Sequence, residues 1–144
     1  MGTGKVVAVC IGKSRGKGKE SAPEILLVPD HGVQGDAHAG PGPRQVTLLD
    51  RESVISSGID AKPGDFAENV LVEGIDFSTV VPGHRIRLGD TELEVTGVGK
   101  PEWKPGDYNF KGVALLAKRG LFARVIKGGV VNAGNPVELV KDEN

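Results

Sequence analysis

The sequence predicts a mainly β protein, either a barrel or a sandwich, with a few short helices. Short apolar runs recur along the chain, and each one ends at a glycine or at an Asp/Gly turn. The 22 glycines and nine prolines are scattered rather than clustered, which is typical of many tight turns. Helix-like segments are too few for an alternating strand–helix–strand fold.

Seven apolar segments are the candidate strands. One pair carries the clearest hairpin signal, because residues 85–88 and 92–98 alternate charged and apolar side chains across a Gly89-Asp90 turn. In chain order, the candidates are residues 5–11, 24–28, 44–49, 69–72, 85–88, 92–98 and 136–140.

Two further segments are predicted to be helices. Residues 51–57 follow Asp50, which can cap a helix, and they stop at a glycine. In residues 121–127, four large apolar side chains share one helical face, and two glycines follow.

The length and charge place limits on function. We expect residues 1–144 to form a single domain. The net charge of −1 gives no support to nucleic-acid binding, and no apolar run approaches the ~20 residues of a membrane helix. Without a signal-peptide pattern, we expect a cytoplasmic protein. The single cysteine, Cys10, lies inside an apolar strand and is predicted to be an inert core residue.

Residues 13–20 form a basic segment between two candidate strands. A solvated loop is the favoured interpretation, and an anion-binding lip is the alternative.

The densest polar segment is residues 30–45, which combine glycines with acidic, histidine and arginine side chains. Three interpretations stay open. Backbone amides and Arg44 could bind an anion. His31, Asp36 and His38 could ligate a metal. Alternatively, the side chains of Asp36 and His38 hold a turn through hydrogen bonds to the backbone.

A second polar segment, residues 63–69, reads Pro-Gly-Asp-Phe-Ala-Glu-Asn. Its Glu68 and Asn69 could recognise the donors and acceptors of a heterocycle. From the residues alone, the favoured interpretation is an Asx-type turn with a solvated Glu68.

Four blocks in this order resemble the MOSC domain family, which is named for the C-terminal domain of molybdenum cofactor sulfurase. They are Gly-Asp-Ala-His-Ala-Gly at 35–40, Arg-Gln-Val-Thr-Leu-Leu-Asp-Arg-Glu-Ser at 44–53, the segment 63–69, and Arg-Gly-Leu-Phe-Ala-Arg-Val at 119–125. The chain looks like the small stand-alone bacterial form of this family. The resemblance extends from about Val6 to Val140.

The resemblance implies a distorted, mostly antiparallel β-barrel with a few short helices. It also implies an association with the molybdenum cofactor, a pterin that carries a phosphate and a dithiolene. The glycine-rich loop and Arg44 would then hold the phosphate, and the second segment would contact the pterin. The cofactor-binding residues implied are Gly35, Asp36, His38, Arg44, Gln45, Glu68, Asn69 and Trp103.

The chain departs from the family at one position. The family typically carries a cysteine in a Gly-Lys-x-Cys-like stretch, proposed to hold sulfur or to ligate molybdenum. Here the matching residues are 99–105, and that position falls at Glu102 or Trp103. A carboxylate or an indole cannot carry a persulfide.

Three functions follow as hypotheses. The first is binding and handling of the molybdenum cofactor or of another anionic pterin, in contact with a molybdoenzyme or a cofactor-biosynthesis protein. The second is a MOSC-type sulfurtransferase or molybdenum-dependent reductase, so enzymatic activity stays open. The third is a protein-interaction module without a cofactor site, for which residues 113–117 are the candidate surface.

Overall fold

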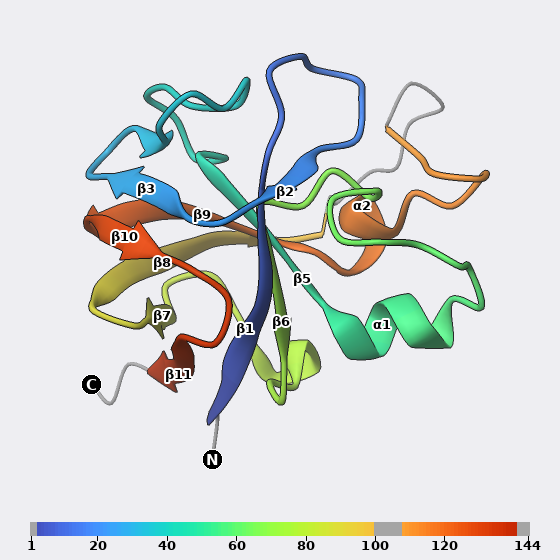
Figure 1. Cartoon of the computed structure of the whole chain (residues 1–144). Coiled ribbons are helices and arrows are strands. Elements are labelled where there is room, and N and C mark those ends of the chain that lie inside the picture. Colours follow the sequence, from blue (N-terminus) through green and yellow to red (C-terminus); the bar gives the residue numbers. More distant parts are fainter. Residues whose placement is uncertain (1–2, 100–107, 141–144) are drawn as a thin grey trace.

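The computed structural model describes residues 3–99 and 108–140, and within them the chain forms a closed β-barrel (Figure 1). The barrel order is β11-β7-β8-β9-β5-β6-β1, with β11 pairing back onto β1. Strand β2 pairs with the C-terminal end of β1 and so extends the sheet there. The barrel strands and β2 are β1 (Thr3–Ile11), β2 (Glu20–Ala22), β5 (Val46–Asp50), β6 (Val70–Glu73), β7 (Arg85–Leu88), β8 (Thr91–Val98), β9 (Leu121–Lys127) and β11 (Pro136–Val140).

The predicted distorted antiparallel barrel is confirmed, with one parallel exception. Strands β5 and β6 run in the same direction, with Leu49 opposite Leu71. Parallel neighbours need a crossover connection. Here α1 (Arg51–Ser56) and the loop after it make that crossover.

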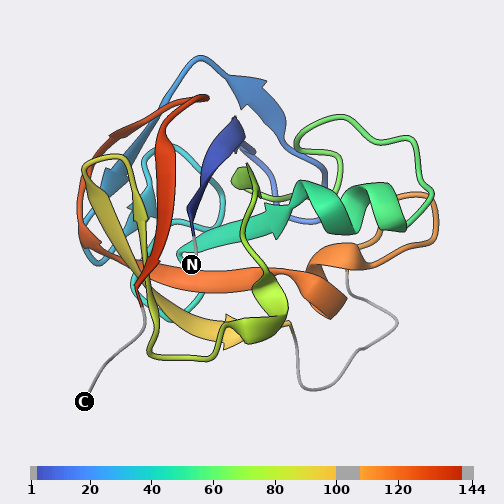
Figure 2. The same ribbon diagram turned by 90° about the horizontal axis from the view of Figure 1, so that it is seen from below.

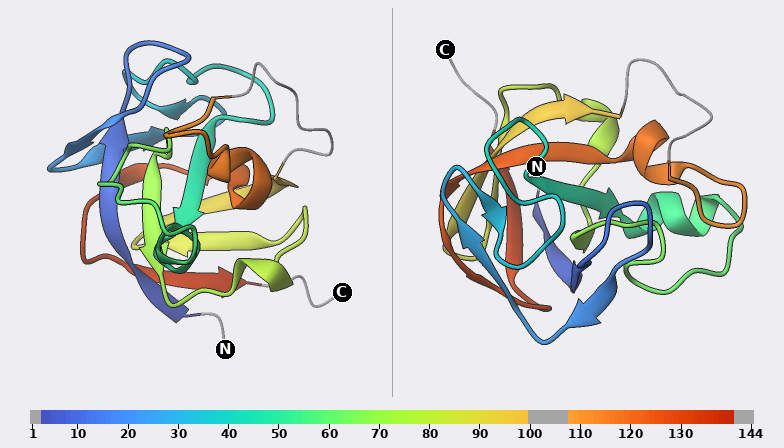
Figure 3. Two further views of the ribbon diagram at one scale, coloured as in Figure 1. Left: turned by 90° about the vertical axis from the view of Figure 1, so that its right-hand side faces the viewer. Right: turned by 90° about the horizontal axis from the view of Figure 1, so that it is seen from above.

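A second, three-stranded sheet has the order β10-β3-β4. Its strands are β3 (Ile25–Val28), β4 (Gly32–Val33) and β10 (Gly129–Val131). Ile25, Val33 and Val131 are fully buried in the same apolar core as the barrel. This sheet and the two helices lie on opposite sides of the molecule (Figure 3).

The predicted helix over residues 121–127 is wrong, because this segment is strand β9. Strand β9 pairs with β8 on one side and with β5 on the other. Its phenylalanine, valine and isoleucine also suit a pleated, buried surface. Tertiary pairing on both edges therefore decides the structure of a segment whose spacing also fits a helix. The seven candidate strands are present, and the short strands β2, β4 and β10 were not predicted.

The two α-helices are short and lie on the same side of the barrel (Figure 2). Helix α1 begins after Asp50, whose carboxylate accepts from the Ser53 amide at 3.3 Å, so the predicted cap is confirmed. Helix α2 (Leu115–Arg119) packs against β5 and α1. A 3₁₀ turn, η1 (Phe77–Thr79), precedes β7. No helix in residues 3–99 and 108–140 is long and apolar enough to cross a membrane.

A second apolar cluster lies between the barrel wall and the helices. It contains Leu49, Phe66, Leu71 and Leu115, all buried. Burial of side chains of this size contributes about 1.5–3 kcal/mol each. The cluster fixes α2 and the segment around Phe66 on the barrel, and α2 borders the site described next.

Candidate functional site

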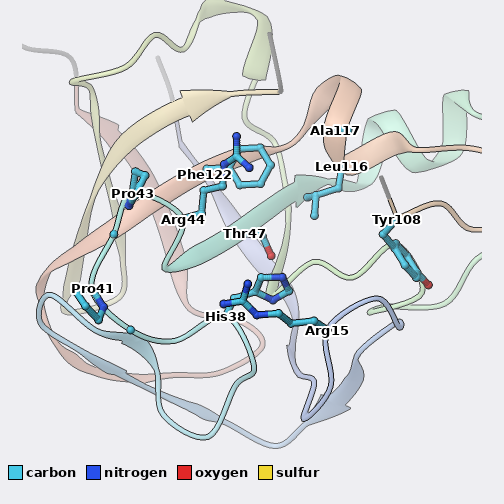
Figure 4. A pocket seen from close by; sticks show the side chains of 12 residues that line it. Arg15, His38, Pro41, Pro43, Arg44, Thr47, Tyr108, Leu116, Ala117 and Phe122 are labelled. Carbon is cyan, nitrogen blue, oxygen red and sulfur yellow. The ribbon is translucent and has the colours of Figure 1, made fainter. Parts of the chain in front are cut away.

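A pocket of about 560 Å³ opens between the glycine- and proline-rich loop before β5, helix α2 and the start of β9 (Figure 4). Each of these elements contributes side chains or backbone to its wall. The described residues that line it are Arg15, His38, Gly40, Pro41, Gly42, Pro43, Arg44, Thr47, Tyr108, Leu116, Ala117 and Phe122.

The pocket wall carries positive charge. The Arg44 guanidinium stacks over the Phe122 ring, 5.1 Å from its centroid, on the β9 side. Arg15 lies beside His38 on another wall (Figure 4), where its Nε donates to the Ala37 carbonyl at 3.3 Å. No acidic side chain is among the described lining residues. The arrangement therefore favours an anionic ligand.

The Gly-Pro-Gly-Pro loop at residues 40–43 forms part of the pocket wall but offers few backbone donors to an anion. Gly40 and Gly42 both have φ of +138°, a conformation that favours glycine. Proline has no N–H, so Pro41 and Pro43 offer no donor. The Gly40 amide already donates to the His31 carbonyl at 2.8 Å. Affinity for an anion would thus come mainly from the arginines rather than from loop amides.

Asp36 lies behind this wall and is the centre of a buried hydrogen-bond network. Its carboxylate accepts from the amides of Gly12 and His38, at 2.9 and 3.0 Å, and from Asn69 Nδ2 at 3.0 Å. It also forms an ion pair with Lys19 Nζ at 2.9 Å. Burial alone disfavours the carboxylate, but the hydrogen bonds from the Gly12 and His38 amides and from Lys19 outweigh it and hold the pKa of Asp36 well below its usual range.

Lys19 is the residue that sequence reasoning missed. Residues 13–18 are exposed, as the solvated-loop interpretation predicts, but Lys19 is only 3% exposed. Arg15, from the same loop, reaches the pocket wall. Nothing in the basic run distinguishes Lys19 from its neighbours, because its partner Asp36 is 17 residues away.

Asn69 connects this network to the pocket floor. Its Nδ2 donates to the Cys10 carbonyl at 3.1 Å as well as to Asp36. Its Oδ1 accepts from the Thr47 amide at 3.1 Å and the Thr47 hydroxyl at 3.2 Å. Thr47 lines the pocket, whereas Asn69 is fully buried behind it. Asn69 thus positions the wall instead of presenting its amide to the cavity.

Glu68 is buried as well, at 1% exposure. Its Oε2 accepts from the Gly64 amide at 2.9 Å, and within the described structure its Oε1 has no hydrogen-bond partner. Burial raises the pKa of Glu68, although the amides of Gly64, Glu68 and Phe66 oppose the shift. The favoured prediction of a solvated Glu68 is therefore wrong.

Two predicted binding residues lie away from the pocket wall. Gln45 points to the β3–β4 side, where its Oε1 accepts from the Val125 amide at 3.0 Å and its Nε2 donates to Asp30 at 3.3 Å. Gly35 occupies a left-handed turn, with φ of +85°. Trp103 and Glu102 lie outside the described residues. Of the predicted set, His38 and Arg44 line the cavity, and Asp36 and Asn69 support its wall.

The turn interpretation of the segment 30–45 gains direct support from the bond between Asp36 and the His38 amide. Among the residues that the structure describes, no three His, Cys, Asp or Glu side chains gather as a metal site would need.

Cys10 is buried, as predicted, and fully shielded from solvent. Burial, with a smaller contribution from the nearby Glu68 carboxyl, raises the pKa of its thiol to about 12. The thiol is therefore protonated near neutral pH and is a poor nucleophile.

The comparisons with known proteins agree with this fold. A model of the MOSC domain family matches residues 35–138, well over half of the chain. The chain therefore belongs to the MOSC domain family. A search of curated proteins found no match.

Solved structures include several with the same architecture. The YuaD protein from Bacillus subtilis superposes with a TM-score of 0.77 at 18% identity, covering 98% of this chain and 97% of that chain. The YiiM protein from Escherichia coli superposes with a TM-score of 0.64 at 24% identity, covering 96% of this chain and 70% of the other. At these identities the likeness shows a shared fold.

Proposed function

We propose that this MOSC domain binds the molybdenum cofactor, or a phosphorylated pterin precursor of it, in the pocket between α2 and the loop before β5. Its role would be cytoplasmic handling of that cofactor, with transfer to a molybdoenzyme or to another cofactor-biosynthesis protein. The observation that carries the proposal is the pairing of Arg15 and Arg44 on the wall of one cavity without a described acidic neighbour.

The residues present fit the phosphate and the ring of such a ligand. Arginine binds phosphate bidentately and keeps its charge at every working pH. Arg44 is held over Phe122, which orders its side chain before a ligand arrives. A cavity of about 560 Å³ lies within the ordinary range of small-molecule sites, roughly 300–1,000 Å³.

The remaining wall supplies weaker polar and apolar contacts. The Thr47 hydroxyl is already hydrogen-bonded to the Ala67 carbonyl and to Asn69 Oδ1. Tyr108 donates to the Asp65 carbonyl at 2.7 Å and is one of the residues that line the pocket. Leu116 and Phe122 add apolar surface for a flat heterocycle. In this proposal Glu68 and Asn69 support the pocket from behind and do not contact the pterin.

We assign no sulfur chemistry to the described residues. When bound, the cofactor would supply redox chemistry at molybdenum. Cys10 is buried and holds its proton, so it suits neither a persulfide nor a thiolate ligand. A sulfurtransferase or reductase activity would therefore need groups other than Cys10.

The test uses a pterin monophosphate, followed by the anisotropy of its own fluorescence. Arg15→Ala and Arg44→Ala should each weaken binding by about tenfold or more, because each removes a charged hydrogen-bond donor worth about 1.5–3 kcal/mol. Arg51→Ala is the matched control, since Arg51 lies on α1 outside the pocket lining. The unphosphorylated pterin controls for the ring alone. Equal affinity for both pterins, or an unchanged Arg44→Ala, would overturn the phosphate assignment.

A further inference from the structure

His38 is the pocket-lining residue that touches the buried ion pair directly. Lys19 Nζ lies 3.1 Å from Nδ1 of the His38 ring, and the same Nζ lies 2.9 Å from Asp36 Oδ1 and 3.1 Å from Asp36 Oδ2. The side chains of Lys19 and Asp36 are 1% and 0% exposed. The His38 side chain is 31% exposed and borders the cavity.

The direction of the hydrogen bond to His38 follows from the chemistry of the ammonium group. Lysine Nζ, when charged, has three N–H donors and no lone pair. Its three close partners are the two Asp36 oxygens and His38 Nδ1, so the ring nitrogen must be the acceptor. Asp36 Oδ2 is 3.7 Å from Nδ1, which is too far to accept a proton from the ring.

The carboxylate of Asp36 is surrounded by hydrogen-bond donors. Asp36 has backbone and side-chain donors on both oxygens and no contact with solvent. A carboxylate in this setting needs a neighbouring cation, which is Lys19. An N–H on His38 Nδ1 would point at the Lys19 ammonium, 3.1 Å away, so the geometry favours Nδ1 as the acceptor.

The other ring nitrogen, Nε2, is available to a ligand in the pocket. In the described part of the chain Nε2 has no hydrogen-bond partner, and the ring lies beside Arg15 at the cavity wall (Figure 4). A neutral imidazole whose Nδ1 accepts must carry its proton on Nε2.

We propose that the buried Lys19–Asp36 pair fixes His38 as the neutral Nε2–H tautomer, and that His38 thereby donates a hydrogen bond to an oxygen of the bound ligand. In this state the ring is neither a general base nor a metal ligand, because Nε2 has no free lone pair. Lys19 and Asp36 are positioning residues, and His38 determines specificity for a ligand with an acceptor at this wall. The identity of that ligand rests on the proposed function, whereas the tautomer does not.

The first test is nitrogen-15 NMR of the imidazole rings in the wild-type protein at pH 7. The chain has three histidines, and His38→Ala assigns the signal by its loss. His84 is an internal reference, because its Nδ1 accepts from the Val81 amide at 3.2 Å and so also requires a proton on Nε2. We expect His38 to show the Nε2–H pattern. A protonated Nδ1, a mixture of tautomers or a doubly protonated ring would overturn the inference.

The second test compares two conservative variants in binding of the pterin monophosphate. His38→Gln places an amide N–H near the position of Nε2, whereas His38→Asn places it nearer to Nδ1. We expect His38→Gln to bind within ~3-fold of wild type, and His38→Asn and His38→Ala to bind ~10-fold more weakly. If His38→Asn bound as well as His38→Gln, the donor would not be Nε2.

Failure of the proposed function is distinguishable from failure of this inference. If the wild-type protein binds no pterin monophosphate, the proposed ligand is wrong. Titration with inorganic phosphate then decides the donor role, because ligand oxygens at this wall should shift the His38 Nε2–H signal and leave that of His84 unchanged. An unmoved His38 signal at saturating phosphate would exclude the donor role.

Discussion

Asn69 donates a hydrogen bond from Nδ2 to Oδ1 of Asp36 at 3.0 Å, which joins the two polar segments of the chain. The two residues are 33 positions apart, and both are buried. Their side chains form a frame behind the pocket, with His38 and Thr47 attached to it by further hydrogen bonds. Asp36 and Asn69 therefore support the pocket wall from behind, whereas Arg15 and Arg44 line the cavity.

Removal of the Asn69 amide should destabilise the protein substantially. Asn69→Ala leaves the Cys10 carbonyl and the Thr47 amide without a partner in a dry site. Unsatisfied buried groups cost about 1–3 kcal/mol each, so we expect a loss of about 2–4 kcal/mol in the free energy of unfolding. Urea denaturation measures it. The exposed Gln34→Ala is the control and should stay within about 0.5 kcal/mol of wild type. An equally small change for Asn69→Ala would contradict the network.

Breaking the Lys19–Asp36 pair should cost far more than breaking a surface pair. Lys19→Met leaves a carboxylate buried without its cation, for which about 3–5 kcal/mol is expected. Arg51→Ala is the control, because the exposed Arg51–Glu73 pair at 3.7 Å is worth about 0–1 kcal/mol. The double variant Lys19→Met/Asp36→Asn should lose less than the sum of its single variants. Additive losses would mean that the two residues act independently.

Glu68 should make the protein less stable as pH rises. Its pKa is raised in the folded protein, so above 4.5, the ordinary value, the folded state keeps a proton that the unfolded state releases. The free energy of unfolding should therefore fall as pH increases from 4.5 through the raised pKa. Glu68→Gln removes the titratable carboxyl group and should reduce the pH dependence of the free energy of unfolding. Urea melts of both proteins at pH 5 and pH 8 measure the difference in slope, and parallel slopes would refute the assignment.

Cys10 should be unreactive in the folded protein. Its thiol is inaccessible, with a pKa raised to about 12, so a thiol reagent should label it only as fast as the chain unfolds. The denatured protein should react with one equivalent of the reagent, because the chain has one cysteine. Rapid labelling of the folded protein at pH 8 would show that the thiol is accessible and would reopen a chemical role for it.

Two glycines provide a matched comparison of backbone strain and steric contact. Both Gly32 and Gly35 have positive φ, so alanine at either costs roughly 1–2 kcal/mol. A Cβ at Gly32 would lie 2.6 Å from the Gln45 carbonyl oxygen, whereas one at Gly35 meets nothing within 4 Å. Gly32→Ala should therefore be the more destabilising by about 1–3 kcal/mol in urea melts. Because Gly35 is not a described lining residue, Gly35→Ala should also bind the pterin monophosphate normally.

Sequence reasoning predicted much of the barrel, because alternation and turn chemistry are local signals. The β7–β8 hairpin at Gly89-Asp90 is an example, with Arg85 opposite Glu94 in the ladder. Strand β9 was not predicted, because its burial depends on β5 and β8, which are distant in sequence. Sequence periodicity cannot report pairing of this kind.

The site was partly predictable for the same reason. Residue type predicts Arg44 as an anion-binding residue, and the family resemblance implies His38 as a cofactor-binding residue; both line the cavity. The sequence predicts Glu68 and Asn69 as contacts to a pterin ring, but the fold buries both side chains behind the pocket wall. Lys19 could not have been found, because a lysine in a basic loop is ordinarily solvated. Only the approach of Asp36 in three dimensions explains its burial.

The pairing of β1 with β11 also governs how this protein can fold. Thr3 lies opposite Glu138, so the barrel closes only when the two extremes of the described chain meet. During synthesis the first strand must wait for the last, and until then both keep an unpaired edge. Such long-range closure is intrinsically slow and leaves intermediates prone to association. Truncation before Pro136 should therefore yield an aggregating chain instead of a smaller barrel.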